Sequence, residues 1–390
     1  MSSHRRGRFA GLQGATALAL VLACGPAVAQ ELSASSFAAD FKVMSTLKPL
    51  VAKGKGKVAV LLPETTTSAR YTSFDAPYLK KAFAAAGLPA RDLIITNAQG
   101  SESSELTQAQ TAISQGATVL VMDPISSGVG ASIETYAKEH NVPVIDYDRL
   151  TLGGSRGYYV SFDNVEVGKL IGQGMEQCLT DWNVKEPKIL VMRGAPTDNN
   201  ATLFAQGYMD VLKPGFDSGK YTNVGEPAGT WDPATARTTF EEQFTAHPNI
   251  NAVVVPNDDN ANAVISYLKT LKVPPKTFPT TGQDATLTGM QNVLTGYQCG
   301  SVYKAIYLEA QAAAALSLYL RAGEEPPAAL VNGKTADTSA NTEVPSVLLT
   351  PLWVTTKNMG ATVVKDGFVP RAKLCAGSAM SKACAAAGIK

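Results

Sequence analysis

Between residues 57 and 147, short apolar runs alternate with longer segments in which apolar residues recur every three or four positions. The short runs predict buried strands at 57–63, 92–98, 118–124 and 142–147, and the periodic segments predict helices at 75–88, 103–116 and 130–141. Gly87 and Gly116 stand where two of these helices should end. Strands separated by helices of this length predict βαβ units and a parallel sheet covered on both faces.

The same rhythm restarts after residue 164. It predicts helices at 165–179, 200–213, 234–247, 261–271 and 287–296, with strands at 188–194, 251–258 and 277–284. A strand end and a long helix follow at 301–323, and a late strand follows at 344–355. This is more chain than a second lobe needs, so we expect it to return to the first. The fold class is therefore α/β, with two doubly wound parallel-sheet lobes joined by several crossings that form a hinge.

We expect the first lobe to comprise residues 57–162 and 304–347, and the second to comprise residues 163–303 and 348–370. Residues 30–56 read as a leading linker or helix, and residues 371–390 as a cysteine-bearing tail.

The first 29 residues have the pattern of a secretory signal peptide. Arg5, Arg6 and Arg8 precede an apolar stretch at 15–23, and Ala27-Val28-Ala29 is a small-x-small cleavage site. We expect cleavage after Ala29; the alternative is a lipobox, "VLAC", with a lipid anchor on Cys24. The apolar stretch is short for a membrane span, and no later segment reaches that length. The mature chain should therefore be soluble and periplasmic, or otherwise extracytoplasmic.

Composition and charge indicate what kind of protein this is. Hydrophobic residues make up 45% and charged residues 17%, which is typical of a globular chain. The formal net charge of +1 gives no indication of a nucleic-acid partner. An exported chain can keep disulfides. Cys375 and Cys384 could close a small ring and Cys178 and Cys299 could form a second bridge, but spacing does not determine pairing.

Polar and aromatic residues gather where the predicted strands end, which is where open α/β sheets bind ligands. They include Arg70, Tyr71, Asp123, Asp148, Arg149, Asp198, Asn199, Asn200, Trp231, Asp232, Asn257, Asp258, Asp259, Gln283, Asp284 and Lys304. Carboxylates, amides and guanidinium groups offer paired donors or acceptors that match neighbouring sugar hydroxyls, and aromatic rings offer flat apolar faces. Neither G-x-G-x-x-G nor the P-loop motif stands at a strand end. We expect a small, neutral, hydroxyl-rich ligand and no cofactor.

Each of these residues also has a plainer interpretation. Asn199, Asn200, Asp258 and Asp284 could cap helices, and Trp231 could belong to the core. An enzyme is disfavoured because the only histidines are His4, His140 and His247, without metal-ligand spacing, although paired carboxylates leave a glycosidase open. A transcription regulator is also disfavoured, because it would need a helix-turn-helix segment before residue 57, and the pattern of a signal peptide stands there instead.

Eight short motifs, taken together and in order, resemble the periplasmic xylose-binding and multiple-monosaccharide-binding proteins of sugar ABC importers. They are YDRL (147–150), SFDNVEVG (161–168), DNNATLF (198–204), VLKPGFDSGK (211–220), TWDPATA (230–236), GQDA (282–285), VYK (302–304) and VPSVLLTPL (344–352). The resemblance covers residues 57–370 and implies a type I periplasmic binding protein fold with a three-segment hinge. It implies a monomeric receptor that hands xylose, or a similar aldopentose or aldohexose, to a membrane permease. Signalling to a chemoreceptor or sensor kinase is an alternative role.

Carried over by position, the family's ligand-binding residues fall on Arg70, Tyr71, Asp148, Arg149, Asn199, Asn200, Trp231, Asn257, Asp258, Gln283, Asp284 and Lys304. The first-lobe aromatic is usually Trp in these relatives and is Tyr71 here, which leaves the exact sugar open. We expect Asp148 and Arg149 to pair with each other without sugar and to grip its hydroxyls when the lobes close.

Overall fold

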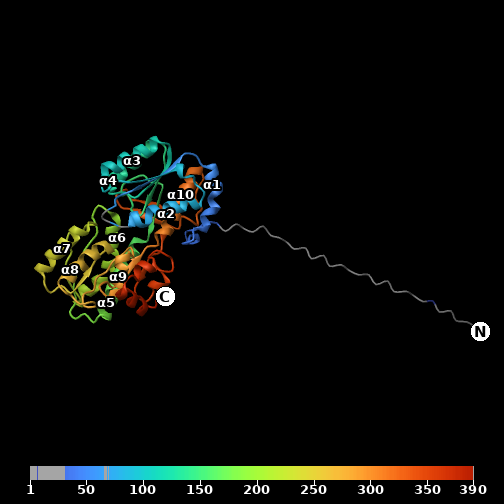
Figure 1. Ribbon diagram of the computed structural model, residues 1–390. Coiled ribbons are helices and arrows are strands. Elements are labelled where there is room, and N and C mark those ends of the chain that lie inside the picture. The colour runs from blue at the N-terminus through green and yellow to red at the C-terminus, as the bar shows by residue number, and fades with distance from the viewer. Residues whose placement is uncertain (1–6, 8–30, 66–67, 69, 390) are drawn as a thin grey trace, which may run out of the picture. The chain divides into compact units, whose positions relative to one another are not determined.

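The computed structural model describes residues 7, 31–65, 68 and 70–389, and it confirms the α/β class. The expected signal peptide, with its cleavage site after Ala29 and the alternative at Cys24, lies outside the described residues apart from Gly7. From Leu32 onward the chain forms one compact unit. Its strands form two groups, which we call the first and second lobes (Figure 1).

The first lobe is built on a sheet whose strand order is β10-β11-β5-β4-β3-β1-β2. Its strands are β1 (Lys57–Leu62), β2 (Leu93–Asn97), β3 (Ala117–Met122), β4 (Val144–Tyr147), β5 (Tyr158–Phe162), β10 (Gly333–Asp337) and β11 (Thr342–Leu349). All neighbours run parallel except β10 and β11, which form an antiparallel pair at one edge. The sequence did not predict β5 or β10.

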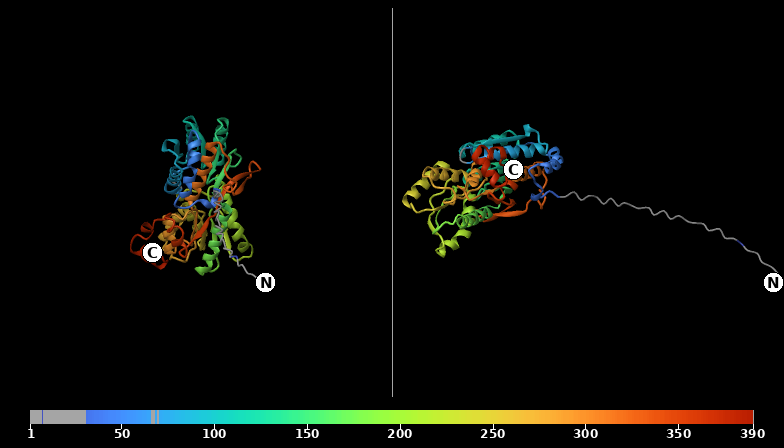
Figure 2. Two further views of the ribbon diagram at one scale, coloured as in Figure 1. Left: turned by 90° about the vertical axis from the view of Figure 1, so that its right-hand side faces the viewer. Right: turned by 60° about the horizontal axis from the view of Figure 1, so that its bottom comes forward.

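Both faces of this sheet are buried, as the continuous apolar runs predict. Alternate residues of β1 belong to different apolar clusters, with Val58 and Val60 on one face and Ala59 and Leu61 on the other. Helices α3 (Glu102–Ser114) and α4 (Ser127–Glu139) supply the second cluster. Helices α2 (Ala76–Ala85) and α10 (Ile306–Ala322) cover the first face, and Figure 2 shows the helices from two further sides.

The second lobe has a parallel sheet of order β7-β6-β8 and an antiparallel pair, β12 and β9. These strands are β6 (Lys188–Val191), β7 (Thr222–Gly225), β8 (Ala252–Val254), β9 (Ser301–Tyr303) and β12 (Leu352–Val354). The strand predicted at 277–284 forms only isolated bridges, Thr280 to Val253 and Gln283 to Val302, which connect the three-stranded sheet to the antiparallel pair. Strand β7 was not predicted, and Pro351 divides the predicted late strand into β11 and β12.

The helices of the second lobe agree with the apolar periodicity. They are α5 (Asn164–Asp181), α6 (Asn199–Asp217), α7 (Pro233–Ala246), α8 (Asp258–Thr270) and α9 (Leu287–Thr295). Helix α6 continues past Pro214 to Asp217, although the sequence predicts its end at residue 213. Asp198 caps its first turn, because the Asp198 side chain accepts a hydrogen bond from the Asn200 backbone N–H.

Within the described chain, three segments pass between the lobes. They lie between β5 and α5, between β9 and α10, and between β11 and β12. The Asp163 backbone N–H donates to the Leu349 carbonyl (3.0 Å), so two of these crossings lie side by side. Such paired crossings are the places where a hinge can bend.

The leading and trailing segments both pack on the lobes. Residues 34–53 form two short 3₁₀ helices, η1 (Ala34–Ser36) and η2 (Lys42–Leu47), and the helix α1 (Lys48–Lys53). Met44 and Leu47 of this segment are buried in the main core. The tail forms α11 (Arg371–Leu374) and α12 (Ser378–Ala386), which pack against α9 and are red in Figures 1 and 2.

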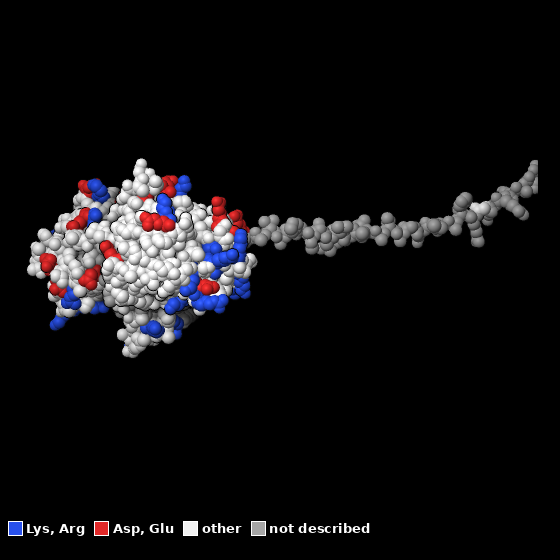
Figure 3. All heavy atoms as spheres, turned by 90° about the horizontal axis from the view of Figure 1, so that it is seen from above, with Lys and Arg blue, Asp and Glu red and all other residues white. Residues whose placement is uncertain are grey.

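Both cysteine pairs that the sequence left open are joined. Cys375 bonds to Cys384 within the tail, and Cys178 on α5 bonds to Cys299 just before β9. No helix in the described part of the chain is long and apolar enough to cross a membrane. On the face drawn in Figure 3, basic and acidic residues are interspersed, as the small net charge suggests.

Candidate ligand-binding site

A cavity of about 30 Å³ lies between the lobes, at the carboxyl ends of their strands. Ten of the twelve residues carried over from the family line it: Arg70, Tyr71, Asp148, Arg149, Asn200, Trp231, Asn257, Gln283, Asp284 and Lys304. Ser68, Asp198 and Phe204 complete the described lining. The lining includes three cations and three carboxylates, so its formal charges balance.

Asp148 lies at a tight turn directly after β4. Its φ of 59° is unusual for a residue other than glycine, and the Arg149 backbone N–H reaches back to the Tyr147 carbonyl at 2.7 Å. Asp148 Oδ1 accepts hydrogen bonds from Arg70 Nη1 (2.6 Å) and from Lys304 Nζ (3.3 Å). Burial by itself raises the pKa of the Asp148 carboxyl, but Arg70 and Lys304 together hold this pKa below its ordinary value.

Arg149 points to other partners, so the expected pairing of Asp148 with Arg149 is wrong. Arg149 Nε lies 3.1 Å from Asp198 Oδ2 and 3.6 Å from Asp123 Oδ1, and Arg149 Nη2 donates to the Tyr71 hydroxyl (2.9 Å). The reason is the turn at Asp148, which sends the side chains of two successive residues in different directions. Arg149 therefore connects the first lobe to Asp198 of the second.

Arg70 is fixed by a buried set of acids. It precedes a π-helical turn, η3 (Tyr71–Asp75), that leads into α2, and π-turns occur frequently at functional sites. Arg70 Nε and Nη2 donate to the two carboxyl oxygens of Asp75 (3.0 and 2.8 Å), and Nη2 also donates to Glu309 Oε2 (3.0 Å). Only Nη1 remains for Asp148, so the guanidinium plane has one orientation toward the cavity.

On the second lobe, the start of α6 presents a polar edge. Asn200 Nδ2 donates to the Asp148 carbonyl (2.9 Å), and Trp231 Nε1 donates to Asp198 Oδ2 (3.0 Å). The indole of Trp231 lies against Gly194, where an added Cβ would come within 2.2 Å of the ring. Glycine at 194 therefore lets Trp231 reach the cavity wall.

At the hinge, Gln283 and Asp284 face Lys304. Lys304 Nζ lies 3.6 Å from Asp284 Oδ1, and Asp284 has a φ of 89°. Gln283 Oε1 and Asp284 Oδ1 are buried and accept no hydrogen bond from the described residues. Burial raises the pKa of Asp284, and Lys304 opposes that rise. Unsatisfied buried acceptors are uncommon in folded proteins, so these two are available to a ligand's hydroxyl groups.

Asn199 and Asp258, also expected in the site, do not line the cavity. Asn199 begins α6 and lines a separate pocket with Ser126 and Ser127. Asp258 is fully buried and accepts hydrogen bonds from Gln298 Nε2 (2.7 Å), Ser301 Oγ (2.8 Å) and the Thr286 backbone N–H (2.7 Å). Asp258 thus joins α8 to β9, and its neighbour Asn257 faces the cavity.

Two lining residues, Ser68 and Phe204, were not expected from the sequence, and Asp198 was expected at the strand ends but not among the residues carried over from the family. Asp198 is the helix cap directly before the predicted Asn199 and Asn200, and Phe204 follows Asn200 by four residues, on the same helical face. Ser68 stands two residues before Arg70 and has no signal beyond that proximity.

Comparison with known proteins places this geometry in a family. A family model described as "Periplasmic binding protein domain" matches residues 58–325. The D-xylose-binding periplasmic protein of Escherichia coli K12 is 36% identical over 287 residues, which cover 72% of this chain and 83% of that protein. The multiple sugar-binding periplasmic receptor ChvE of Rhizobium radiobacter is 31% identical over 354 residues, which cover 85% of this chain and 96% of that protein.

A solved structure shows the same fold. The ABC transporter solute binding protein from Clostridium phytofermentans, crystallised with β-D-glucose, is 27% identical, with a TM-score of 0.72. The match covers 81% of this chain and 99% of that one. These findings confirm the resemblance seen in the motifs: the chain belongs to the periplasmic binding protein family and has its type I, two-lobed fold.

Proposed function

We propose that this chain is the extracytoplasmic receptor of an ABC sugar importer and that it binds a monosaccharide between its lobes. The observation that carries this proposal is the inter-lobe cavity, in which both lobes contribute planar donors, acceptors and an aromatic ring. Three cations balance three carboxylates there, which favours a neutral ligand over a sugar acid or a sugar phosphate.

The unsatisfied acceptors support a hydroxyl-rich ligand. A sugar hydroxyl can donate to Gln283 Oε1 or Asp284 Oδ1, while the amide of Asn200 and the guanidinium of Arg149 can share their bonds with sugar oxygens. Trp231 and Tyr71 offer apolar faces for the C–H side of a pyranose ring. Xylose, or a similar aldopentose or aldohexose, has this chemistry, and two relatives are named for xylose and for several sugars.

Binding requires the lobes to part and close again. A cavity of about 30 Å³ has room for about two water molecules, which is less than a sugar ring needs. The walls are held together by Arg149 with Asp198 and by Asn200 with the Asp148 carbonyl. A sugar that contacts both walls favours the closed form, because in the open form it reaches only one of them.

The remaining features of the proposal follow from this role. The chain would be exported, with its signal peptide cleaved after Ala29 or lipidated at Cys24, and would act as a monomer. Its closed form would dock on the membrane permease, and signalling to a chemoreceptor or sensor kinase would use that same form. Sugar would be bound and released without a chemical reaction.

A thermal-shift screen of pentoses and hexoses, followed by calorimetric titration, tests the proposal. We expect one or a few sugars to raise the melting temperature and to bind with a one-to-one stoichiometry, in the micromolar range, about −8 kcal/mol. Sugar acids should bind more weakly than the neutral sugar with the same ring. Absence of any bound monosaccharide, or turnover of the sugar, would overturn it.

A further inference from the structure

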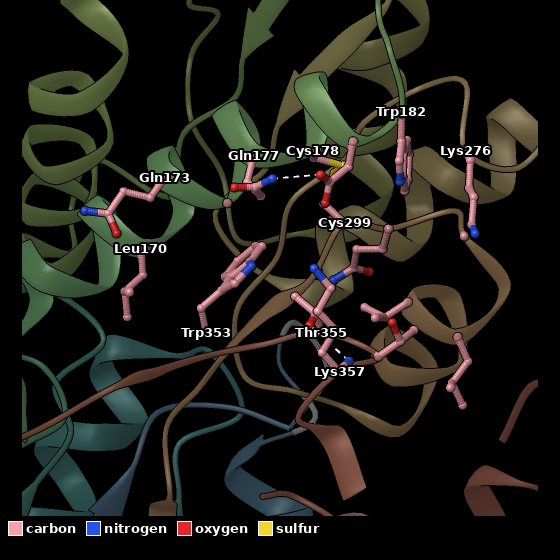
Figure 4. Close-up of a pocket in the computed structure, with 17 residues that line it drawn as sticks. Leu170, Gln173, Gln177, Cys178, Trp182, Lys276, Cys299, Trp353, Thr355 and Lys357 are labelled. Atoms are coloured by element: carbon pink, nitrogen blue, oxygen red, sulfur yellow. Dashed lines mark hydrogen bonds between the residues drawn. A yellow bond between two sulfur atoms is a disulfide. The ribbon is translucent and has the colours of Figure 1, made fainter. Parts of the chain in front are cut away.

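The second lobe contains a cavity of about 570 Å³ that shares no lining residue with the inter-lobe cavity. It lies between the second half of α5, the segment that runs from α9 to β9, and β12 with the residues after it (Figure 4). Its volume falls within the usual range of small-molecule sites. Nothing in the inter-lobe mechanism uses this cavity.

Two tryptophans line it, and one of them is seated by glycines. Trp353 comes from β12 and Trp182 from the end of α5, and Figure 4 shows them at different sides of the cavity. An added Cβ would come within 2.2 Å of the Trp353 ring at Gly174, and within 2.6 Å of it at Gly300. Gly174 lies inside α5, where glycine costs about 0.5–1 kcal/mol relative to alanine. Glycine at this position leaves room for the Trp353 indole to pack against α5.

The polar part of the lining consists mainly of uncharged amides and hydroxyls. Gln173 and Gln177 stand one turn apart on α5, and Thr355 and Thr356 follow β12. Gln298 Nε2 donates to Asp258 Oδ1 (2.7 Å) and to the Gly300 carbonyl (3.1 Å). Gln298 Oε1 is then buried without a hydrogen-bond partner in the part of the chain that is described.

The charged residues at the cavity do not form an anion site. Lys276 and Lys357 are exposed, and the Asp181 carboxylate offsets one of them. Asp181 Oδ1 accepts a hydrogen bond from Gln177 Nε2 (2.7 Å). An apolar ligand would in turn leave the amides and hydroxyls without partners, which is unfavourable. The lining therefore fits a ligand that is neutral, rich in hydroxyls and partly apolar on its ring faces.

We propose that this cavity is a second carbohydrate site, which takes a saccharide of two or more sugar units. Trp353 and Trp182 provide ring platforms, and Gln173, Gln177 and Gln298 hydrogen-bond the hydroxyls. The volume exceeds what one sugar ring fills, so adjoining units occupy the rest. The site is separate from the monosaccharide cleft and does not depend on the cleft having the proposed function.

The test is a titration of the mature chain with xylobiose and with cellobiose, by calorimetry and by saturation-transfer NMR. We expect binding in the millimolar range, unchanged in an Asp198→Asn variant of the inter-lobe cleft. Trp182→Ala and Gln177→Ala should each weaken disaccharide binding at least tenfold and leave monosaccharide affinity unchanged. Gln115→Ala, which removes an exposed amide of the first lobe, is the matched control and should change neither affinity.

Three results would overturn the proposal. One is that neither disaccharide binds the wild-type chain at millimolar concentration. Another is that folded Trp182→Ala and Gln177→Ala variants, checked by circular dichroism, keep wild-type disaccharide affinity. Gln177 is exposed on the helix, so this variant keeps the test decisive if Trp182→Ala fails to fold. Loss of disaccharide binding in Asp198→Asn alone would assign the disaccharide to the cleft and would also reject the second site.

Discussion

Replacing Asp198 with Asn should weaken sugar binding strongly while leaving the unliganded protein nearly as stable as before. Asp198 Oδ2 lies 3.1 Å from Arg149 Nε across the lobes, and both side chains are almost fully buried. Removing one partner of a buried ion pair costs about 3–5 kcal/mol, because the remaining charge is left without compensation. Arg149 keeps Asp123 at 3.6 Å, so we expect about 2–3 kcal/mol here.

This cost should appear in the affinity for sugar, because Arg149 and Asp198 meet only when the lobes are closed. A loss of 2–3 kcal/mol corresponds to a dissociation constant about 30- to 150-fold higher. The cap of α6 should survive, since Asn caps a helix about as well as Asp does. The free energy of unfolding without sugar should therefore fall by no more than about 1 kcal/mol.

Calorimetric titration and urea unfolding of the same preparations measure the two quantities. Asp217→Asn is the matched control, since Asp217 pairs with Lys213 at the exposed end of α6 and both side chains are 62% exposed. An exposed pair contributes less than about 1 kcal/mol, and the control should leave sugar affinity unchanged. The reasoning is refuted if Asp198→Asn binds sugar within about threefold of the wild type, or if the unliganded variant loses as much stability as affinity.

Three further predictions concern single features. Burial raises the pKa of Glu105 from 4.5 to about 7, so its charged form destabilises the fold. About 3 kcal/mol of unfolding free energy should be lost as pH rises from about 4.5 to 7. Urea unfolding across this range should show a smaller loss in Glu105→Gln, and an equal dependence of stability on pH in the two proteins would contradict the role of Glu105. Removing the Cys178–Cys299 disulfide, which spans 121 residues, should lower the unfolding free energy by about 5 kcal/mol. Removing the Cys375–Cys384 disulfide, which spans nine residues, should lower it by only about 2.5 kcal/mol. Unfolding of variants with both cysteines of a pair replaced by serine measures the two losses, and the opposite ranking would contradict the explanation by loop entropy. Gly194→Ala should displace Trp231 and weaken sugar binding, measured by calorimetry, at least tenfold. Gly219→Ala is the control: an added Cβ there has free space, but the positive φ strains any residue other than glycine, so this variant should lower stability and leave sugar affinity unchanged.

The strands buried on both faces could be predicted from sequence because their apolar runs are continuous, as in β1 and β3. The missed strands lack that signal. Strand β5 mixes Tyr and Ser with apolar residues, whereas β7 and β10 lie at sheet edges and carry polar side chains. At 277–284, Phe278 and Thr280 are buried, but Pro279 cannot donate a ladder hydrogen bond, and only isolated bridges form.

The candidate site was predictable as a set of strand ends, and less so residue by residue. Topology brings the carboxyl ends of parallel strands to one edge, and this placed Arg70, Asp148 and Lys304 together. Which of two adjacent side chains faces the cavity depends on local turns. Asp198 and Asn200 face it while Asn199, between them, turns away, and Asn257 faces it while Asp258 is buried beneath. The pattern of polar residues along the sequence does not predict which of two neighbouring side chains faces the cavity.

The central claim is that one sugar is held by both lobes at once. A crystal structure with the sugar that the thermal screen selects tests it most directly. We predict the sugar ring between Arg149 of the first lobe and Asn200 and Trp231 of the second, with Asp284 and Lys304 at the hinge side. A sugar bound to residues of one lobe only, or outside this cavity, would contradict the account.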